Sequence, residues 1–170
     1  MAKYSEQVTS FIPHLRRYAR ALMGGDIMAA DDLVQDCLER ALSRIHLWRK
    51  GSDLRAWLFT IMHNLYANHI RKLSTAPKFV DLDSDNIRMN DNSNAERDLE
   101  IRDIQQAINT LTPDQREVLL LVTLEGLPYR EVATILGMPE GTVMSKLSRA
   151  REKLRVIMQM ENPKRLRRVK

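Results

Sequence analysis

Apolar residues recur at helical spacing through most of the chain, and this pattern constrains the fold more than any other feature. They return every three or four residues, as they do on one face of an amphipathic helix. No segment shows the strict alternation of a half-buried strand. The segments with helical spacing are 5–23, 28–48, 54–73, 99–111, 113–125, 128–136 and 141–160. The sequence therefore predicts an all-α protein.

The stretch 74–97 interrupts the helical pattern. It is rich in Ser, Asn and Asp, contains Pro77, and has little apolar periodicity. This composition is typical of a flexible connection between folded units. We therefore predict two small helical domains, 1–73 and 98–170, joined by a flexible linker over 74–97.

Several residues are placed to begin or end these helices. Thr112 followed by Pro113 is an N-cap and then a proline at the first helical position, and Gln115 completes a capping box. Ser52 or Asp53 is the N-cap expected for the helix over 54–73.

Composition excludes several classes of protein. The chain has 170 residues and a single cysteine, Cys37, so an internal disulfide is impossible. Its longest apolar runs are too short to cross a bilayer, and its first eighteen residues lack the apolar core of a secretory signal. We therefore expect a cytoplasmic protein with no membrane insertion.

The charge is unevenly distributed along the chain. The overall net charge is +5, but the last thirty residues, 141–170, hold ten basic and two acidic side chains. The preceding segment, 98–140, holds three basic and eight acidic side chains. A basic block of this kind favours a polyanionic partner, most often a nucleic acid. A solvated helix with a basic tail explains the charge equally well.

Residues 129–148 have the pattern of a helix-turn-helix. This unit needs a small residue where its helices cross and a turn residue that tolerates positive φ. Ala133 and Gly137 are placed for these two roles, and Val143 is placed to close the small core from the second helix. An ordinary helical hairpin is the alternative.

The second helix of this unit has distinct inner and outer faces. At about 100° per residue, one side carries only core residues, which are Val143, Leu147, Ala150 and Leu154. The other side carries Ser145, Ser148 and Arg149, short or bidentate groups suited to base edges. Arg149 is the best candidate for a guanine contact, and a phosphate contact or a solvated arginine is the alternative.

Three segments together resemble the extracytoplasmic-function group of bacterial sigma factors. AADDLVQDCLERAL (29–42) resembles the polymerase-binding helix of that family, and LRAWLFTIMHNLYANHIRK (54–72) resembles its promoter-melting region. Residues 111–155 resemble its fourth region. The resemblance implies a first domain that binds RNA polymerase core and melts the minus-ten element, and a second domain that reads the minus-thirty-five element.

The resemblance also implies three sets of site residues. The set for binding polymerase core is Asp32, Leu33, Gln35 and Asp36. The set for the minus-ten element is Asn64, Asn68, Arg71 and Lys72. The set for the minus-thirty-five element is Thr142, Met144, Ser145, Lys146, Ser148 and Arg149. Met144 departs from the family pattern, because many members have arginine at this position, and methionine allows packing on a thymine methyl group instead.

Aromatic and histidine residues of 54–72 allow more than one role. Trp57 and Phe59 are candidate stacking platforms for bases, although a core role is favoured for Trp57. His63 and His69 are not spaced as a metal pair and are interpreted as structural or surface residues.

The resemblance predicts a sigma factor whose partners are RNA polymerase core, promoter DNA and an anti-sigma factor. No nucleophile–base pair, carboxylate dyad or metal cluster stands out, so we expect no catalytic residue, no metal and no cofactor. Two other functions fit the same sequence. One is a stand-alone helix-turn-helix transcription regulator, and the other is a sigma-like protein that titrates a regulator.

Overall fold

The structure, a computed structural model, describes residues 2–75 and 95–161. Most of the predicted linker, 76–94, and the basic tail, 162–170, lie outside these described residues. The elements in chain order are α1 (Ala2–Ser10), α2 (Ile12–Leu22), α3 (Ile27–Ser43), the 3-10 turn η1 (Ile45–Leu47), α4 (Leu54–Thr75), α5 (Ala95–Asn109), α6 (Pro113–Thr123), α7 (Tyr129–Leu136) and α8 (Glu140–Glu161). The described residues form no strand, which confirms the all-α prediction.

The predicted caps set the helix ends. Thr112 and Gln115 form the complete capping box at the start of α6. Asp53 caps α4, because its carboxylate accepts hydrogen bonds from the backbone N–H groups of Arg55 and Ala56. The predicted helix over 5–23 is instead two helices that meet at Phe11, since Pro13 has no N–H to continue the first one.

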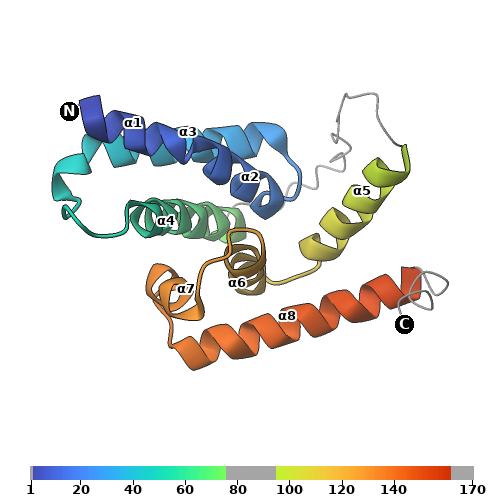
Figure 1. Cartoon of the computed structure of the whole chain (residues 1–170). Helices are drawn as coiled ribbons and strands as arrows, with labels where there is room; N and C mark the ends of the chain where they lie inside the picture. Colours follow the sequence, from blue (N-terminus) through green and yellow to red (C-terminus); the bar gives the residue numbers. More distant parts are fainter. Residues whose placement is uncertain (1, 76–94, 162–170) are drawn as a thin grey trace.

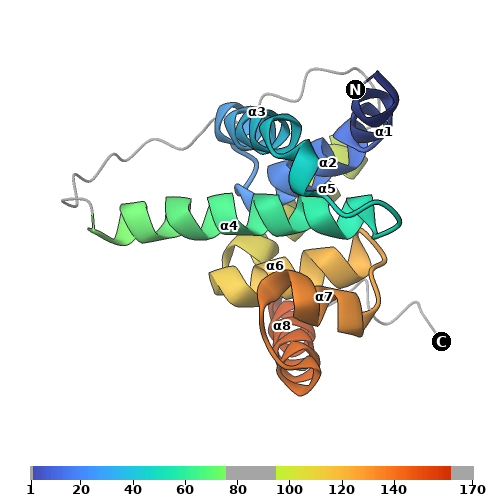
Figure 2. The same ribbon diagram turned by 90° about the vertical axis from the view of Figure 1, so that its left-hand side faces the viewer.

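The helices stack in layers around α4 (Figures 1 and 2). In Figure 2, α1–α3 lie on one side of α4 and α6–α8 lie on the other. We call α1–α4 the N-terminal half and α5–α8 the C-terminal half. The two halves are in contact, mainly through α2 with α6 and α4 with α7.

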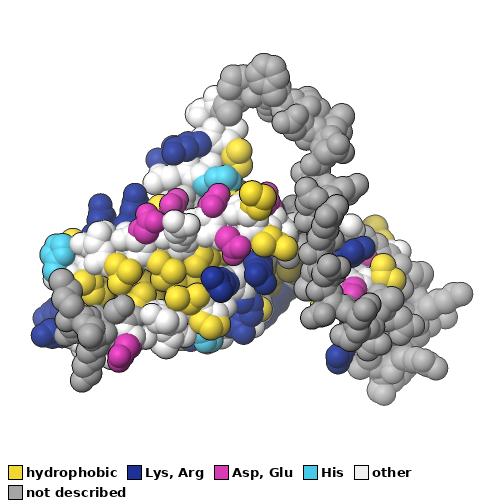
Figure 3. Space-filling view, turned by 90° about the horizontal axis from the view of Figure 1, so that it is seen from above, with side chains coloured by type: hydrophobic (Ala, Val, Ile, Leu, Met, Phe, Trp, Pro, Cys, Tyr) yellow, Lys and Arg dark blue, Asp and Glu magenta, His cyan; other side chains and the backbone are white. Residues whose placement is uncertain are grey.

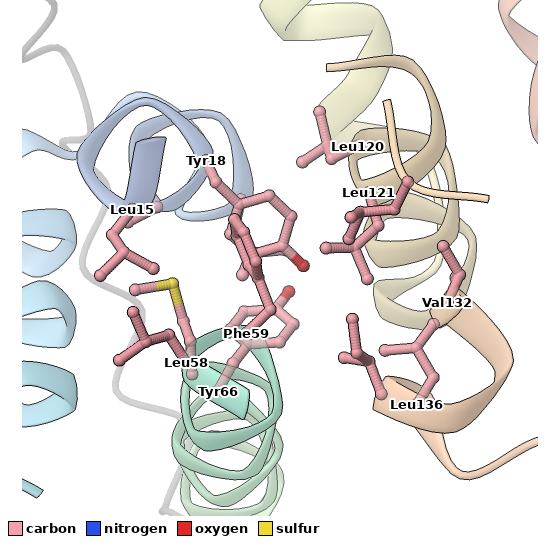
Figure 4. Close-up of a cluster of buried hydrophobic side chains, with 14 of the residues drawn as sticks. Leu15, Tyr18, Leu58, Phe59, Tyr66, Leu120, Leu121, Val132 and Leu136 are labelled. Carbon is pink, nitrogen blue, oxygen red and sulfur yellow. The ribbon is translucent and has the colours of Figure 1, made fainter. Parts of the chain in front are cut away.

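Buried apolar side chains run continuously from one half into the other. Leu15 and Tyr18 of α2 and Leu58, Phe59 and Tyr66 of α4 lie on the N-terminal side of this core, as Figure 4 shows. The residues that face them from α6 and α7 include Leu120, Leu121, Val132 and Leu136. Each half therefore uses the other to cover part of its apolar surface.

The end of α2 is held by side chains of the C-terminal half. Gln105 donates a hydrogen bond to the carbonyl of Ala21, Asn109 to that of Gly24, and Arg116 to that of Leu22. These carbonyls have no partner inside the helix, so the side chains satisfy groups that would otherwise need water. Arg116 also places a positive charge at the negative end of the helix dipole.

Gly24 makes this close approach possible, and Gly51 provides a matched comparison. Both have positive φ, 73° and 88°. A Cβ at Gly24 would lie 3.3 Å from two side-chain atoms of Asn109, whereas a Cβ at Gly51 would meet nothing within 4 Å.

We therefore predict that Gly24→Ala destabilises the protein more than Gly51→Ala. Both variants lose about 1–2 kcal/mol because alanine tolerates positive φ poorly. Gly24→Ala loses about 1 kcal/mol more, because Asn109 must move and release its hydrogen bonds. Urea unfolding measures the two free energies. Equal losses would show that the contact between Asn109 and Gly24 contributes nothing.

Candidate nucleic-acid interface

The helix-turn-helix is formed by α7 and α8 as predicted. Gly137 ends α7 with φ of 63° in the left-handed region. Ala133 is buried where the helices cross, and Val143, Leu147 and Ala150 are buried on the inner side of α8. Leu154 is partly buried and packs on the same core. The outer side of α8 is therefore free for another molecule.

Four of the six residues predicted for the minus-thirty-five element are exposed on α8. They are Met144, Ser145, Ser148 and Arg149, whereas Thr142 and Lys146 are half-buried. The ammonium of Lys146 is 3.0 Å from the carboxylate of Asp114. The side chains of Ser148 and Arg149 make no hydrogen bond or ion pair with the described part of the chain. Arg149 is therefore available to bind a ligand, and Lys146 is engaged within the protein.

The predicted minus-ten residues line the outer side of α4. Asn64, Asn68, Arg71 and Lys72 are all exposed. At 100° per residue, Asn64, Asn68 and Arg71 lie opposite the side of α4 that contacts the C-terminal half. Packing of the two halves therefore leaves these side chains uncovered.

The predicted polymerase-binding face of α3 is also at the surface. Asp32, Gln35 and Asp36 are exposed, and Gln35 donates a hydrogen bond of 3.0 Å to Glu39. Leu33 is only 7% exposed, so most of its surface packs in the core. Its contribution to a binding surface is therefore mainly to hold α3 in place.

A surface groove between α3 and α4 brings two of the predicted sets together. Asp32 and Asp36 line it from α3, and Asn68, Arg71 and Lys72 line it from α4. Arg40 of α3 also lines the groove. Among the described residues, none of these five charged side chains forms an ion pair. The α3 wall thus carries two carboxylates and one arginine, and the α4 wall carries Arg71 and Lys72 as its charged groups. A basic wall of this kind suits a nucleic acid.

Exposed apolar residues, which the sequence pattern did not predict, lie beside the acidic face. Figure 3 shows an apolar strip along the surface formed by α1–α3, with acidic side chains beside it. Met28 is 81% exposed and Leu42 is 47% exposed, and both lie on the same side of α3 as Asp32 and Gln35. Their high exposure can be known only once the neighbours of α3 are placed.

The exposed fractions of Phe59 and Trp57 show whether these aromatic side chains can stack on bases. Phe59 is 1% exposed and packs edge-on against Tyr18, so the expectation that it stacks on bases is wrong. Trp57 is partly buried and packs on the core, in agreement with the favoured prediction. Cys37 is fully buried, and burial raises the pKa of its thiol to about 12.

Two buried carboxylates join the halves, and the sequence did not indicate either. Glu125, at the end of α6, lies 3.1 Å from His14, 3.0 Å from Arg17 and 3.1 Å from Arg55. Glu117 lies 2.8 Å from His63 of α4. The one available signal was the position of Glu117 directly before the apolar run 118–122, because a charge that is buried with such a run requires a partner.

Two family models match the chain. Residues 8–63 match the sigma2 domain of PhyR, and residues 101–154 match sigma-70 region 4. The chain is also 36% identical over 157 residues to the ECF RNA polymerase sigma factor EcfG of Rhodopseudomonas palustris, covering 92% of this chain and 85% of that protein. The chain belongs to the ECF family of RNA polymerase sigma factors. The ECF sigma-E factor of Escherichia coli is 28% identical over 163 residues, covering 89% of this chain and 81% of its relative.

Two solved structures share the fold of this ECF family member. The sigma factor RpoE of Bartonella quintana, in complex with the anti-sigma factor NepR, matches with a TM-score of 0.81 and 31% identity, over 94% of this chain and 98% of that one. CnrH, in complex with the cytosolic domain of CnrY, matches with a TM-score of 0.71 and 25% identity, over 94% and 90% of the two chains. Among the described residues of the ECF family member, no helix is long and apolar enough to span a membrane.

The pair His63–Glu117 makes the stability of this sigma factor dependent on pH. The hydrogen bond to Glu117 raises the pKa of His63, against the opposing effect of burial. Burial raises the pKa of Glu117, against the opposing hydrogen bond from His63. Both groups therefore hold protons more tightly in the folded chain than in the unfolded chain.

We predict that the free energy of unfolding falls as pH rises above 6.5, the ordinary pKa of histidine. The stabilisation from a raised pKa is complete below the unfolded value and is lost as pH rises through the folded value. One group changes the free energy by at most about 1.4 kcal/mol per pH unit. Urea unfolding at pH 6 and pH 8 measures the fall, which His63→Gln reduces. His46→Gln, at an exposed histidine, is the control, and an identical fall in both variants would contradict the prediction.

Proposed function

We propose that this ECF sigma factor binds RNA polymerase core through α3 and promoter DNA through the outer sides of α4 and α8. The observation that supports this most is the placement of three polar faces, from separate segments, at the surface of one folded body. The remaining sides of the same helices form the core. The protein acts in the cytoplasm, where polymerase and promoters are, and performs no chemical reaction of its own.

Run-off transcription with purified polymerase core tests this function. A promoter-specific transcript that needs the chain is expected. A stand-alone transcription regulator would bind duplex DNA without giving a transcript from core alone. A sigma-like protein that titrates a regulator would give no transcript either. Absence of the transcript on every promoter that related sigma factors use would overturn the proposal.

The acidic face of α3 suits a basic partner surface. Asp32, Gln35 and Asp36 present carboxylate and amide groups, and Met28 and Leu42 add apolar area at either end. Apolar area excludes water around charged contacts, and such contacts are stronger when water is excluded. We propose that polymerase core binds this face.

Asp32→Lys combined with Asp36→Lys should weaken core binding by about tenfold or more, a loss of at least 1.4 kcal/mol. Like charges then meet across the interface, and the effect is largest at low salt. Both positions are exposed, so circular dichroism should show an intact fold. Glu6→Lys, on the exposed side of α1, is the control. Unchanged affinity of the double variant would place the contact elsewhere.

The two halves pack against each other, whereas the promoter elements that they are proposed to contact lie far apart on DNA. Positions minus ten and minus thirty-five are separated by about 25 base pairs, or roughly 85 Å of B-DNA at 3.4 Å per step. The longest helices, α4 and α8, have 22 residues each, or about 33 Å. We therefore propose that 1–73 and 98–170 act as separate domains on the promoter and that the linker 74–97 spans the gap.

We propose that an anti-sigma factor controls this protein. One solved structure that it resembles, RpoE with NepR, is a complex of a sigma factor with an anti-sigma factor. An inhibitor that binds both halves would keep the faces for the two promoter elements together. A chain that is constitutively active in its cell and never co-purifies with an inhibitor would overturn this proposal.

We predict that two single variants impair different steps, one the reading of the promoter and the other its melting. Arg149→Ala should weaken duplex binding and relax the preference at one base pair, by about 1–3 kcal/mol for a bidentate guanine contact. Asn64→Ala should spare duplex binding and impair opening, because a base edge is available to Asn64 only after the strands separate. Duplex binding and permanganate footprinting on one promoter measure the two steps. The same defect in both variants would contradict the assignment.

A further inference from the structure

We infer that Glu125 is an electrostatic latch that holds the two halves together and must be released before the protein can occupy both promoter elements. The latch is defined by Glu125 of the C-terminal half and by His14, Arg17 and Arg55 of the N-terminal half. Its inhibitory effect rests on the proposed function, whereas its existence can be tested on the isolated protein.

The carboxylate of Glu125 is completely enclosed and is held from two helices. Its side chain is 0% exposed, whereas those of His14, Arg17 and Arg55 are 41%, 49% and 26% exposed. Arg17 of α2 binds Oε1 through both Nε and Nη2, at 3.3 and 3.0 Å. Arg55 of α4 binds Oε2 at 3.1 Å, so each carboxylate oxygen has at least one partner.

The two arginines also bind the main chain that carries Glu125. Arg17 donates to the carbonyl of Leu124 at 3.1 Å, and Arg55 donates to the carbonyl of Glu125. These carbonyls follow the last turn of α6, where the helix dipole is negative. The N-terminal half therefore recognises the end of α6 together with its carboxylate, and the recognition depends on relative position.

Loss of the charge on Glu125 should favour separation strongly. A buried ion pair adds little when it is compared with an apolar pair, but removing one partner leaves a buried charge without compensation. Here that charge is Arg55, which is 26% exposed, whereas Arg17 and His14 are solvated more easily. The apolar contacts between Tyr18, Tyr66, Leu120 and Leu121 would remain, and they are less directional than the charged contacts. The charged cluster therefore determines whether the halves are held in this arrangement.

Closure inhibits the protein by keeping its binding faces close together, without covering them. Asn64, Asn68, Ser148 and Arg149 are exposed in the closed chain. One promoter element at a time therefore remains accessible, but two elements about 85 Å apart are not. This continued exposure of the DNA-binding residues distinguishes the latch from a contact that buries them.

Distance between the halves can be measured with two fluorophores on introduced cysteines. Ser43 at the end of α3 and Gln159 near the end of α8 are exposed, one on each half. Cys37 need not be removed, because it is buried and its thiol pKa of about 12 keeps it unreactive. Single-molecule energy transfer in the full chain carrying Ser43→Cys and Gln159→Cys then reports the closed and open populations.

Glu125→Gln should raise the ratio of open to closed molecules at least tenfold. Arg17→Gln should do the same, and the double variant should add little, because both changes break one cluster. Glu6→Gln makes the same charge change away from the interface and should leave the ratio unchanged. Thermal melting, monitored by circular dichroism, checks that each variant is folded. If Glu125→Gln does not fold, Arg17→Gln tests the same cluster, because Arg17 is half-exposed.

A functional consequence follows for promoters with both elements. With polymerase core present and sigma limiting, Glu125→Gln should increase promoter occupancy up to tenfold on a two-element promoter. It should give no increase on the same promoter without its minus-thirty-five element.

Unchanged energy transfer in folded Glu125→Gln or folded Arg17→Gln would overturn the latch. Opening without a gain on the two-element promoter would overturn its inhibitory role. Failure of the wild-type chain to support any transcription would instead overturn the proposed function and leave the measured populations unaffected.

Discussion

Burial of two carboxylates between the halves is the constraint on which the arrangement of the whole molecule depends. An ionised carboxylate without a partner is too costly to bury, so Glu117 and Glu125 need cationic or hydrogen-bonding groups from the other half. His63 supplies one partner, and His14, Arg17 and Arg55 supply the others. Apolar contact alone would tolerate several relative positions of the halves, whereas these pairs define one.

The helix α4 links the packing of the halves to the proposed function, because one side of it is buried in the core and the other side is exposed. One side, with Phe59, Met62 and Tyr66, is buried between the layers of Figure 2. The other side leaves Asn64 and Asn68 at the surface. A single helix therefore carries both the core that holds the halves together and the residues proposed to contact a melted strand.

Much of the fold followed from the sequence, because its causes are local. Helical spacing predicted the helices, and Gly137 predicted the turn of the helix-turn-helix. Thr112 predicted one helix start, and Ser52 or Asp53 predicted another, where Asp53 is the cap. The inner face of α8 followed from the 100° rotation per residue. The break at Phe11 was missed because the apolar spacing continues across it, although Pro13 was a visible reason for it.

For the candidate site too, local features could be predicted from the sequence and long-range contacts could not. By itself, the sequence determined which residues share an outer helical face, such as Ser148 with Arg149, because a helix fixes that geometry within a few residues. Only the tertiary structure decided that Phe59 is buried, that Lys146 pairs with Asp114, and that Glu125 meets His14, Arg17 and Arg55. The partners of Glu125 lie 70 to 111 positions away in the chain. Local periodicity contains no information about contacts at that separation, which arise only when two packed layers bring their charged side chains together.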